Sequence, residues 1–209
     1  SYPENELKTY RENSKQKLIS GEKKVSVLAS KLLYETLYGK EHPFGYRVIP
    51  EDFDNVSREQ LLSFHAEHYR TLDCDVIISG KVDDAALTVF RREFENIPAK
   101  ISAFDNSTPA PLPAVEKKNV QEVPNVVQSA IKLARPLFSK THPDYIPLQV
   151  LNTVFGGYFG SRLMTNIRED KGYTYGIGSG LVALGTTGIW SIGSEVGVEV
   201  TKATLKEIY

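Results

Sequence analysis

The twenty residues GGYFGSRLMTNIREDKGYTY, numbered 156–175, carry the densest set of structural signals in this chain. A break of small residues opens the stretch, and a short helix over 161–170 follows it. Gly172 then lets the chain reverse, and Thr174-Tyr175 enters a strand. The pattern therefore predicts Arg168 in the last turn of the helix and Tyr175 at the beginning of the strand, on the same face as Ile177.

The segments around this stretch predict alternating pairs of strands and helices. Downstream, 174–184 and 188–195 are typical of a strand pair joined through Gly185-Thr186-Thr187, and a last helix begins at Glu199. Upstream, a helix is predicted over 143–155, preceded by strands over 119–122 and 126–135 that Pro124 separates. The order is ββααββα.

The first half of the chain is richer in helices. Patterns predict helices over 4–18 and 24–38, the second ending at Gly39, and a capping box at Ser57 begins a helix that runs to about Tyr69. A buried strand is expected over 74–79, and a helix from Asp83 to about Ile97. Together with the second half, this predicts an α+β fold with helices packed on an antiparallel or mixed β-sheet.

The overall composition excludes several classes of protein. The 209 residues include 25 Lys+Arg against 26 Asp+Glu, which leaves no basic stripe for a nucleic acid. No stretch approaches the roughly 18 apolar residues that a membrane-spanning helix needs. The chain starts in a polar helical segment and ends inside a helical pattern, so we expect it to be a piece of a longer protein.

Ordinary packing explains each of the candidates for metal or nucleophilic chemistry. His65 and His68 are three residues apart, whereas zinc-binding helices use His-Glu-x-x-His or His-x-x-Glu-His, and both flank an apolar stripe. We therefore expect them to be packed and not to be ligands. Cys74 lies in an apolar run, where a buried small side chain is expected. The glycines at 176, 178 and 180 fall inside a strand, leaving room for close packing instead of holding a phosphate.

The stretch 156–175 resembles the C-terminal half-domain of the M16 peptidases, the pitrilysin, insulinase and mitochondrial processing peptidase family. The matching features are the small-residue break, Ser161-Arg162-Leu163, the Ile-Arg-Glu-x-Lys-Gly run from Ile167, and Thr174-Tyr175. His42-Pro43-Phe44-Gly45 and the Pro-rich segment 99–118 fall in the family's order as well. The resemblance covers nearly the whole chain and implies an M16-like fold.

The resemblance assigns a substrate-clamping role to Arg168 and Tyr175. An Arg fork and a phenolic hydroxyl are two donors suited to a peptide carbonyl, and at a cleavage site they can also stabilise an oxyanion. The chain lacks His-x-x-Glu-His, so it is expected to bind no metal itself. Zn is expected either upstream in the parent protein or on a zinc-bearing M16 partner subunit, and the substrate is expected to be a peptide or unfolded polypeptide.

The isolated chain is accordingly expected to be inactive. An alternative is a non-catalytic scaffold or peptide-binding subunit, of the kind that M16-like core proteins form in respiratory complexes. The resemblance implies a division into 1–98, the closing part of a first half-domain, a linker over 99–118, and 119–209, the opening part of a second. Together these parts would form one permuted unit, with the strand over 74–79 completing the sheet begun at 126–135.

Overall fold

The computed structural model describes residues 2–69, 77–94 and 115–209. These residues form two compact units, each assembled from separate parts of the chain. Residues 2–16, 50–69 and 77–94 belong to the first, and residues 17–49 and 115–209 belong to the second. The helix α1 (Glu4–Gly21) begins in the first unit and ends in the second.

The first unit is helical and contributes no buried residue from its helices. It contains α3 (Pro50–Asn55), α4 (Arg58–His68) and α5 (Asp84–Phe94). The predicted capping box is confirmed, because Ser57 Oγ accepts from the Gln60 N–H at 3.1 Å and Gln60 Oε1 accepts from the Ser57 N–H at 2.6 Å. Asp83 caps α5 by accepting the Ala86 N–H at 2.9 Å.

The strand predicted over 74–79 is wrong where the structure describes it. Ile77, Ile78 and Ser79 lie in no strand, and the Ile77 side chain is 91% exposed. Cys74 and its two successors lie outside the described residues. The run was apolar enough for a strand, but an exposed isoleucine contributes no burial to hold one in place.

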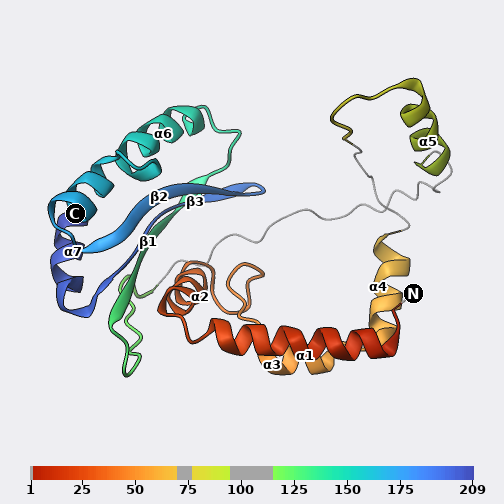
Figure 1. Ribbon diagram of the computed structural model, residues 1–209, viewed down its shortest axis with the longest axis horizontal. Coiled ribbons are helices and arrows are strands. Elements are labelled where there is room, and N and C mark those ends of the chain that lie inside the picture. The colour runs from red at the N-terminus through yellow and green to blue at the C-terminus, as the bar shows by residue number, and fades with distance from the viewer. Residues whose placement is uncertain (1, 70–76, 95–114) are drawn as a thin grey trace. The chain divides into compact units, whose positions relative to one another are not determined.

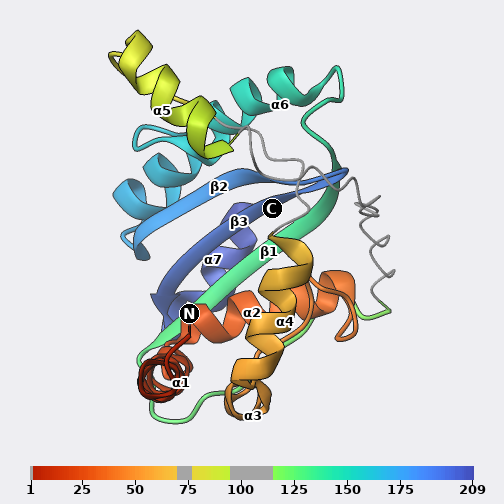
Figure 2. The same ribbon diagram turned by 90° about the vertical axis from the view of Figure 1, so that its right-hand side faces the viewer.

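The second unit is built on a three-stranded antiparallel sheet with the order β1-β3-β2 (Figure 2). Its strands are β1 (Gln128–Phe138), β2 (Thr174–Leu184) and β3 (Thr187–Gly197). The predicted hairpin is confirmed: Leu184 pairs with Thr187, and Gly185 turns the chain at φ 59°. The predicted strand over 119–122 is wrong, since these residues form no strand and are exposed.

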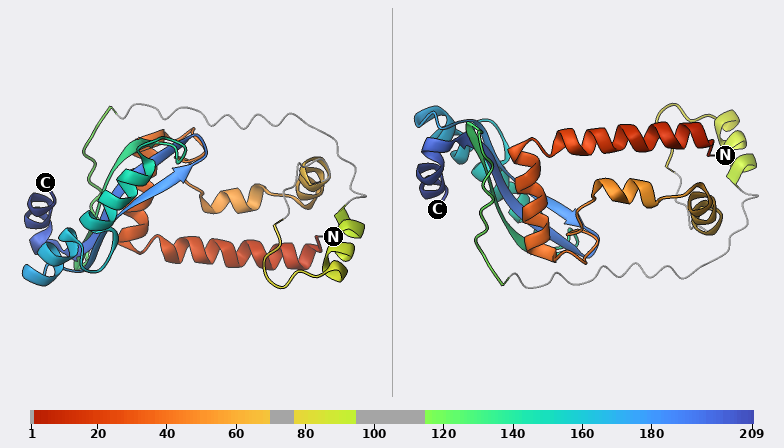
Figure 3. Two further views of the ribbon diagram at one scale, coloured as in Figure 1. Left: turned by 90° about the horizontal axis from the view of Figure 1, so that it is seen from above. Right: turned by 90° about the horizontal axis from the view of Figure 1, so that it is seen from below.

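Helices cover both faces of this sheet (Figures 1 and 3). The two views of Figure 3 show α6 (Tyr145–Asn152) in front of the sheet from above and α2 (Val25–Tyr38) in front of it from below. On the α6 side, α6 continues into the π-helix η1 (Thr153–Gly157), and the π-helix η2 (Met164–Asp170) follows. The chain then ends in η3 (Val198–Val200) and α7 (Thr201–Ile208).

Each face of the sheet carries its own apolar core. On the side of η1 and η2, the buried residues are Leu163, Met164, Ile167, Ile177 and Ile192. On the other side, α2 brings Leu37 and Tyr38 against Ile189 of β3. Burial raises the pKa of the fully buried Tyr38 hydroxyl, and the nearby Tyr34 adds to the effect. The two cores make β3, the central strand, the best-buried element of the unit.

The helix α2 thus packs on a strand from the other end of the sequence. The partner strand predicted over 74–79, the other part of the permuted arrangement, is not formed at 77–79. Most of the Pro-rich segment 99–118 lies outside the described residues. The boundaries at 1–98, 99–118 and 119–209 therefore stay a prediction.

A buried asparagine joins the helices to the sheet. Asn152, the last residue of α6, donates from Nδ2 to the Ser179 carbonyl at 3.2 Å. Its Oδ1 accepts from Ser179 Oγ at 2.7 Å and from Trp190 Nε1 at 2.8 Å. One side chain therefore bonds both β2 and β3, and fixes where the end of α6 meets the sheet.

Side chains from the helices also satisfy the outer edge of β2. Besides the Ser179 carbonyl, the Ile177 N–H donates to Met164 Sδ at 3.4 Å. An uncharged edge strand without proline is otherwise open to pairing with another strand. The contacts from Asn152 and Met164 close this edge at 177–179.

Asn152→Ala tests the bridge between helix and sheet. The substitution removes three hydrogen bonds and leaves Trp190 Nε1 and the Ser179 groups without partners, so we expect unfolding to become easier by about 2–3 kcal/mol. Urea unfolding measures this. Asn119→Ala is the matched control, because Asn119 is exposed and its amide donates to Thr36 Oγ1 and to the Glu116 carbonyl. Equal losses in the two variants would show that Asn152 has no special role.

Gly156→Ala tests the close approach of η1 to β2. A Cβ at Gly156 would lie 2.5 Å from Ser179 Oγ and 2.8 Å from both Leu163 Cδ1 and the Ser179 nitrogen. We expect a loss of about 1–3 kcal/mol from overpacking. Gly180→Ala serves as the control, since a Cβ there meets nothing within 4 Å. A Gly156 variant as stable as the control would mean that η1 does not depend on this contact.

Candidate substrate-clamping site

Arg168 lies in the last turn of η2, as predicted, and its guanidinium donates no hydrogen bond to the described residues. Its Cζ lies 4.4 Å from the ring centroid of Phe159. Among the described residues, the carboxylate that pairs with it is Glu169, with 3.9 Å between Nη1 and Oε1 and both side chains partly exposed. An exposed pair at that separation contributes little. The guanidinium therefore lies against an aromatic ring, while its N–H groups donate no hydrogen bond within the described residues.

Tyr175 lies at the beginning of β2 and points into solvent. Its side chain is 93% exposed, and no hydrogen bond or ring contact ties it to the described residues. The prediction that Tyr175 shares a face with Ile177 is wrong. It assumed that side chains alternate regularly along the strand, but a β-bulge between Thr174 and Ile177 interrupts that alternation. Ile177 is buried in the core, whereas Tyr175 stands free beside the bulge.

The turn between these two residues is firmly held. Gly172 has a φ of 65°, which favours glycine, and its N–H donates to the Arg168 carbonyl at 3.2 Å. The Tyr173 N–H donates to the Ile167 carbonyl at 3.0 Å, and Ile167 is fully buried. Arg168 and Tyr175 are thus carried by a closed turn between a helix and a strand that pack on each other.

The end of η2 is also tied to α7 through Glu207. Asn166 Nδ2 donates to Glu207 Oε2 at 3.2 Å, and Lys171 Nζ lies 3.5 Å from Glu207 Oε1. The hydrogen bond from Asn166, followed by the charge of Lys171, lowers the pKa of Glu207. Because the pKa of Glu207 is lower in the folded state than in the unfolded chain, this contact stabilises the fold at pH values above the pKa of the unfolded state. The stabilisation is lost as the pH falls through the pKa of the folded state.

The structure brings Arg168 and Tyr175 to one end of the same helix and strand pair without joining them directly. No hydrogen bond links the two side chains, and both reach solvent. What the arrangement offers chemically is a charged planar donor and a neutral hydroxyl donor, neither one engaged within the described chain.

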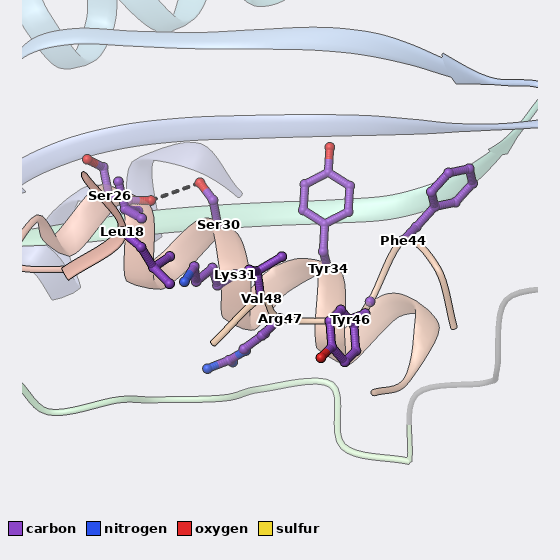
Figure 4. A pocket seen from close by; sticks show the side chains of 11 residues that line it. Leu18, Ser26, Ser30, Lys31, Tyr34, Phe44, Tyr46, Arg47 and Val48 are labelled. Carbon is purple, nitrogen blue, oxygen red and sulfur yellow. Dashed lines mark hydrogen bonds between the residues drawn. The ribbon is translucent and has the colours of Figure 1, made fainter. Parts of the chain in front are cut away.

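Two cavities in the second unit are lined by other residues. One, of about 570 Å³, lies between α2 and residues 44–48 (Figure 4). Its two cations are already neutralised, since Lys31 pairs with Glu22 at 2.6 Å and Arg47 pairs with Glu35. The other, of about 650 Å³, lies between α2, β1 and α7. Neither of these two cavities includes Arg168 or Tyr175.

The prediction that His65 and His68 are packed in a core is wrong, because His65 is exposed and His68 is only half-buried; both contact aromatic rings. His65 stacks on Tyr69 with 5.0 Å between ring centroids, and His68 lies 4.3 Å from Phe64. Across residues 2–69, 77–94 and 115–209, no group of three or more His, Cys, Asp or Glu side chains is placed to hold a metal ion. The described residues therefore do not fit a zinc site. Over the same residues, no helix has both the length and the apolar character needed to span a bilayer.

Sequence reasoning missed Phe159 and Asn152. Phe159 belongs to the small-residue break, and nothing in its neighbours predicts a contact with Arg168 nine residues later. Asn152 lies inside the helix predicted over 143–155, although in the structure it is the last residue of α6. Its polarity inside an otherwise apolar helix was the available signal, because a buried amide requires partners.

Comparison with known proteins identifies the family. Residues 55–209 match the family described as the peptidase M16 inactive domain. The chain is 24% identical over 179 residues to an uncharacterized zinc protease, YmxG, of Bacillus subtilis, covering 85% of this chain and 42% of YmxG. It is 26% identical over 140 residues to a probable inactive metalloprotease, YmfF, of the same bacterium, covering 65% of this chain and 32% of YmfF. The chain thus spans less than half the length of these relatives.

Solved structures show the same fold. A peptidase M16 inactive domain from Pseudomonas fluorescens matches with a TM-score of 0.82 and 23% identity, covering all of this chain and 50% of that one. A chain of complex III₂ from Candida albicans matches with a TM-score of 0.71 and 15% identity, covering 90% of this chain and 46% of that one. The predicted α+β fold of M16 type is confirmed, and the chain belongs to the peptidase M16 family through its inactive domain.

Proposed function

We propose that this chain is the substrate-clamping, non-zinc part of an M16 zinc peptidase. In this proposal Arg168 and Tyr175 donate hydrogen bonds to the backbone of a peptide or unfolded polypeptide, and a separate zinc-bearing half carries out the hydrolysis. The observation that carries it is the free state of both donors: the Tyr175 side chain is 93% exposed, and the Arg168 fork donates no hydrogen bond within the described residues.

The chemistry of the pair suits a peptide carbonyl. The carbonyl oxygen has two lone pairs, and a guanidinium and a phenol can each donate to it. If the carbonyl gains negative charge during cleavage, both bonds strengthen, and donors fixed beforehand stabilise that charge without reorganising. The closed turn at Gly172 and the buried Ile167 support such fixed positions.

The closed edge of β2 favours capture by side chains over capture by strand addition. A peptide pairing along β2 would need the Ile177 N–H and the Ser179 carbonyl, which already bond Met164 and Asn152. The open donors near this edge are the Arg168 and Tyr175 side chains. A bound peptide would therefore meet this chain through two side chains at the bulged end of the strand.

The zinc-bearing half is a partner in this proposal. It belongs either to the upstream part of the parent protein or to a separate subunit. The relatives named as zinc proteases are more than twice as long as the stretch that matches them, which leaves room for such a half. That half would also supply the surface that closes a groove over Arg168 and Tyr175.

A non-catalytic scaffold is the second candidate. The likeness to a chain of complex III₂ favours it, because the same fold occurs there within a larger assembly. The relative named as a probable inactive metalloprotease is in keeping with this candidate as well. The two candidates differ in whether a zinc-bearing half with His-x-x-Glu-His accompanies the chain.

Arg168→Ala should lower kcat/KM of the assembled peptidase about 100-fold, because it removes a donor to the reacting backbone. Tyr175→Phe should lower it about tenfold, since only one hydroxyl is lost. Cleavage of a fluorogenic peptide by the assembled protein measures both. Arg168→Lys should rescue only in part, because a lysine has no planar fork.

The same variants should leave folding almost unchanged. Both side chains are exposed or loosely held, so we expect unfolding free energies within about 0.5 kcal/mol of the parent. Lys202→Ala, in the first turn of α7, is a matched loss of charge that should leave turnover unaffected. Full activity in Arg168→Ala, with zinc present in the partner half, would remove the clamping role.

A further inference from the structure

Phe159 contacts the Arg168 guanidinium although most of its side chain is exposed to solvent. The Phe159 side chain is 62% exposed, yet its ring lies 4.4 Å from the Arg168 Cζ. A single exposed phenylalanine is not unusual in itself. Here, however, the ring lies against the guanidinium that is assigned to the candidate site.

The chain holds Phe159 in place on a short connection between two helices. Upstream, η1 ends at Gly157 against β2, and Tyr158 is extended at φ −148° and ψ 173°. Downstream, Ser161 is fully buried and its N–H donates to the Tyr158 carbonyl at 3.1 Å. Both ends of this connection are therefore anchored, and the exposed Phe159 ring lies against Arg168 of η2.

The Tyr158 ring lies over Gly160. A Cβ at Gly160 would lie 2.9 Å from Tyr158 Cε2. The Tyr158 ring thus lies beside Gly160, whereas the Phe159 ring contacts Arg168. The two adjacent rings have different roles, and this difference supplies a matched control.

The geometry of a stacked guanidinium favours donation in its own plane. A ring against one face attracts the cation and leaves the five N–H groups around the edge free. A carboxylate partner would occupy those N–H groups, but Glu169 reaches only 3.9 Å. The ring therefore restrains Arg168 without consuming its donors, which an ion pair cannot do.

We propose that Phe159 is a positioning residue that holds the Arg168 guanidinium by its face so that the fork presents its edge to a bound peptide backbone. This inference rests on the proposed clamping function and adds the group that orients the clamp. It also explains why arginine suits position 168: a lysine ammonium has no plane to stack and no fork to aim.

The test compares Phe159→Leu, Phe159→Tyr and Tyr158→Leu in the assembled peptidase. Phe159→Leu should lower kcat/KM about two- to tenfold, the range of a cation–π contact at a partly exposed site. Phe159→Tyr keeps an aromatic face and should retain parent activity. Tyr158→Leu removes the neighbouring ring and should leave kcat/KM unchanged. Combined with Arg168→Ala, Phe159→Leu should have no further effect, because the group it orients is gone.

A second readout follows the contact itself. In protein with ¹⁵N-labelled arginine, the Arg168 Nε–Hε resonance should shift when Phe159 becomes leucine and return close to its original position in Phe159→Tyr. Tyr158→Leu should leave it in place. Since a general loss of stability would not produce this pattern, the resonance separates orientation from folding.

The outcomes distinguish this inference from the function on which it rests. If Arg168→Ala retains full activity, both the clamp and its positioning residue are overturned. If Arg168→Ala is impaired but Phe159→Leu is as active as the parent, the clamp stands and the role of Phe159 is overturned. An increase in activity in Phe159→Leu would also overturn it, since the ring would then be withholding the guanidinium from substrate.

Discussion

The second unit depends on one buried amide. Asn152 has only 9% of its surface exposed, and its side chain satisfies a carbonyl and a hydroxyl of Ser179 and the indole N–H of Trp190. A buried polar group without partners costs more than a single hydrogen bond contributes, so this network has to be complete. Because its partners lie on two strands, Asn152 sets the position of the end of α6 relative to both.

That constraint reaches the candidate site through the backbone that follows Asn152. η1 begins at the next residue, and Gly156 approaches Ser179 so closely that no side chain fits between them. The chain then crosses from η1 to η2 through Tyr158 and Phe159, and η2 delivers Arg168. The small-residue break at 156–160 therefore packs closely on β2 at Gly156 and leads into the helix that carries the partly exposed Arg168.

Sequence predicted the elements whose signals are local. The capping box at Ser57, the end of α2 at Gly39 and the hairpin at Gly185 each follow from side-chain or backbone preferences within a few residues. The strand over 119–122 and the one over 74–79 failed where described, because an apolar run is stable as a strand only when a partner and burial exist. The bulge before Ile177 escaped prediction because it depends on pairing with β3.

The site was predictable in part and for a different reason. Arg168 and Tyr175 came from the resemblance to the M16 peptidases, and the structure adds that Tyr175 is exposed, that Arg168 is partly exposed, and that neither side chain donates a hydrogen bond within the described residues. Phe159 could not be found in the same way, since a ring over a guanidinium is a contact in space between residues nine apart. The π-helical turns of η1 and η2, which both contact β2, have no signal in the sequence pattern either.

The central claim is that Arg168 and Tyr175 hold one and the same peptide backbone. A double-mutant cycle of Arg168→Ala and Tyr175→Phe, read as kcat/KM of the assembled peptidase, tests it most directly. Donors that share one acceptor or one short backbone segment should be coupled, and the account predicts a coupling of at least about 0.5 kcal/mol. Strictly additive losses, or no loss in either single variant, would contradict it.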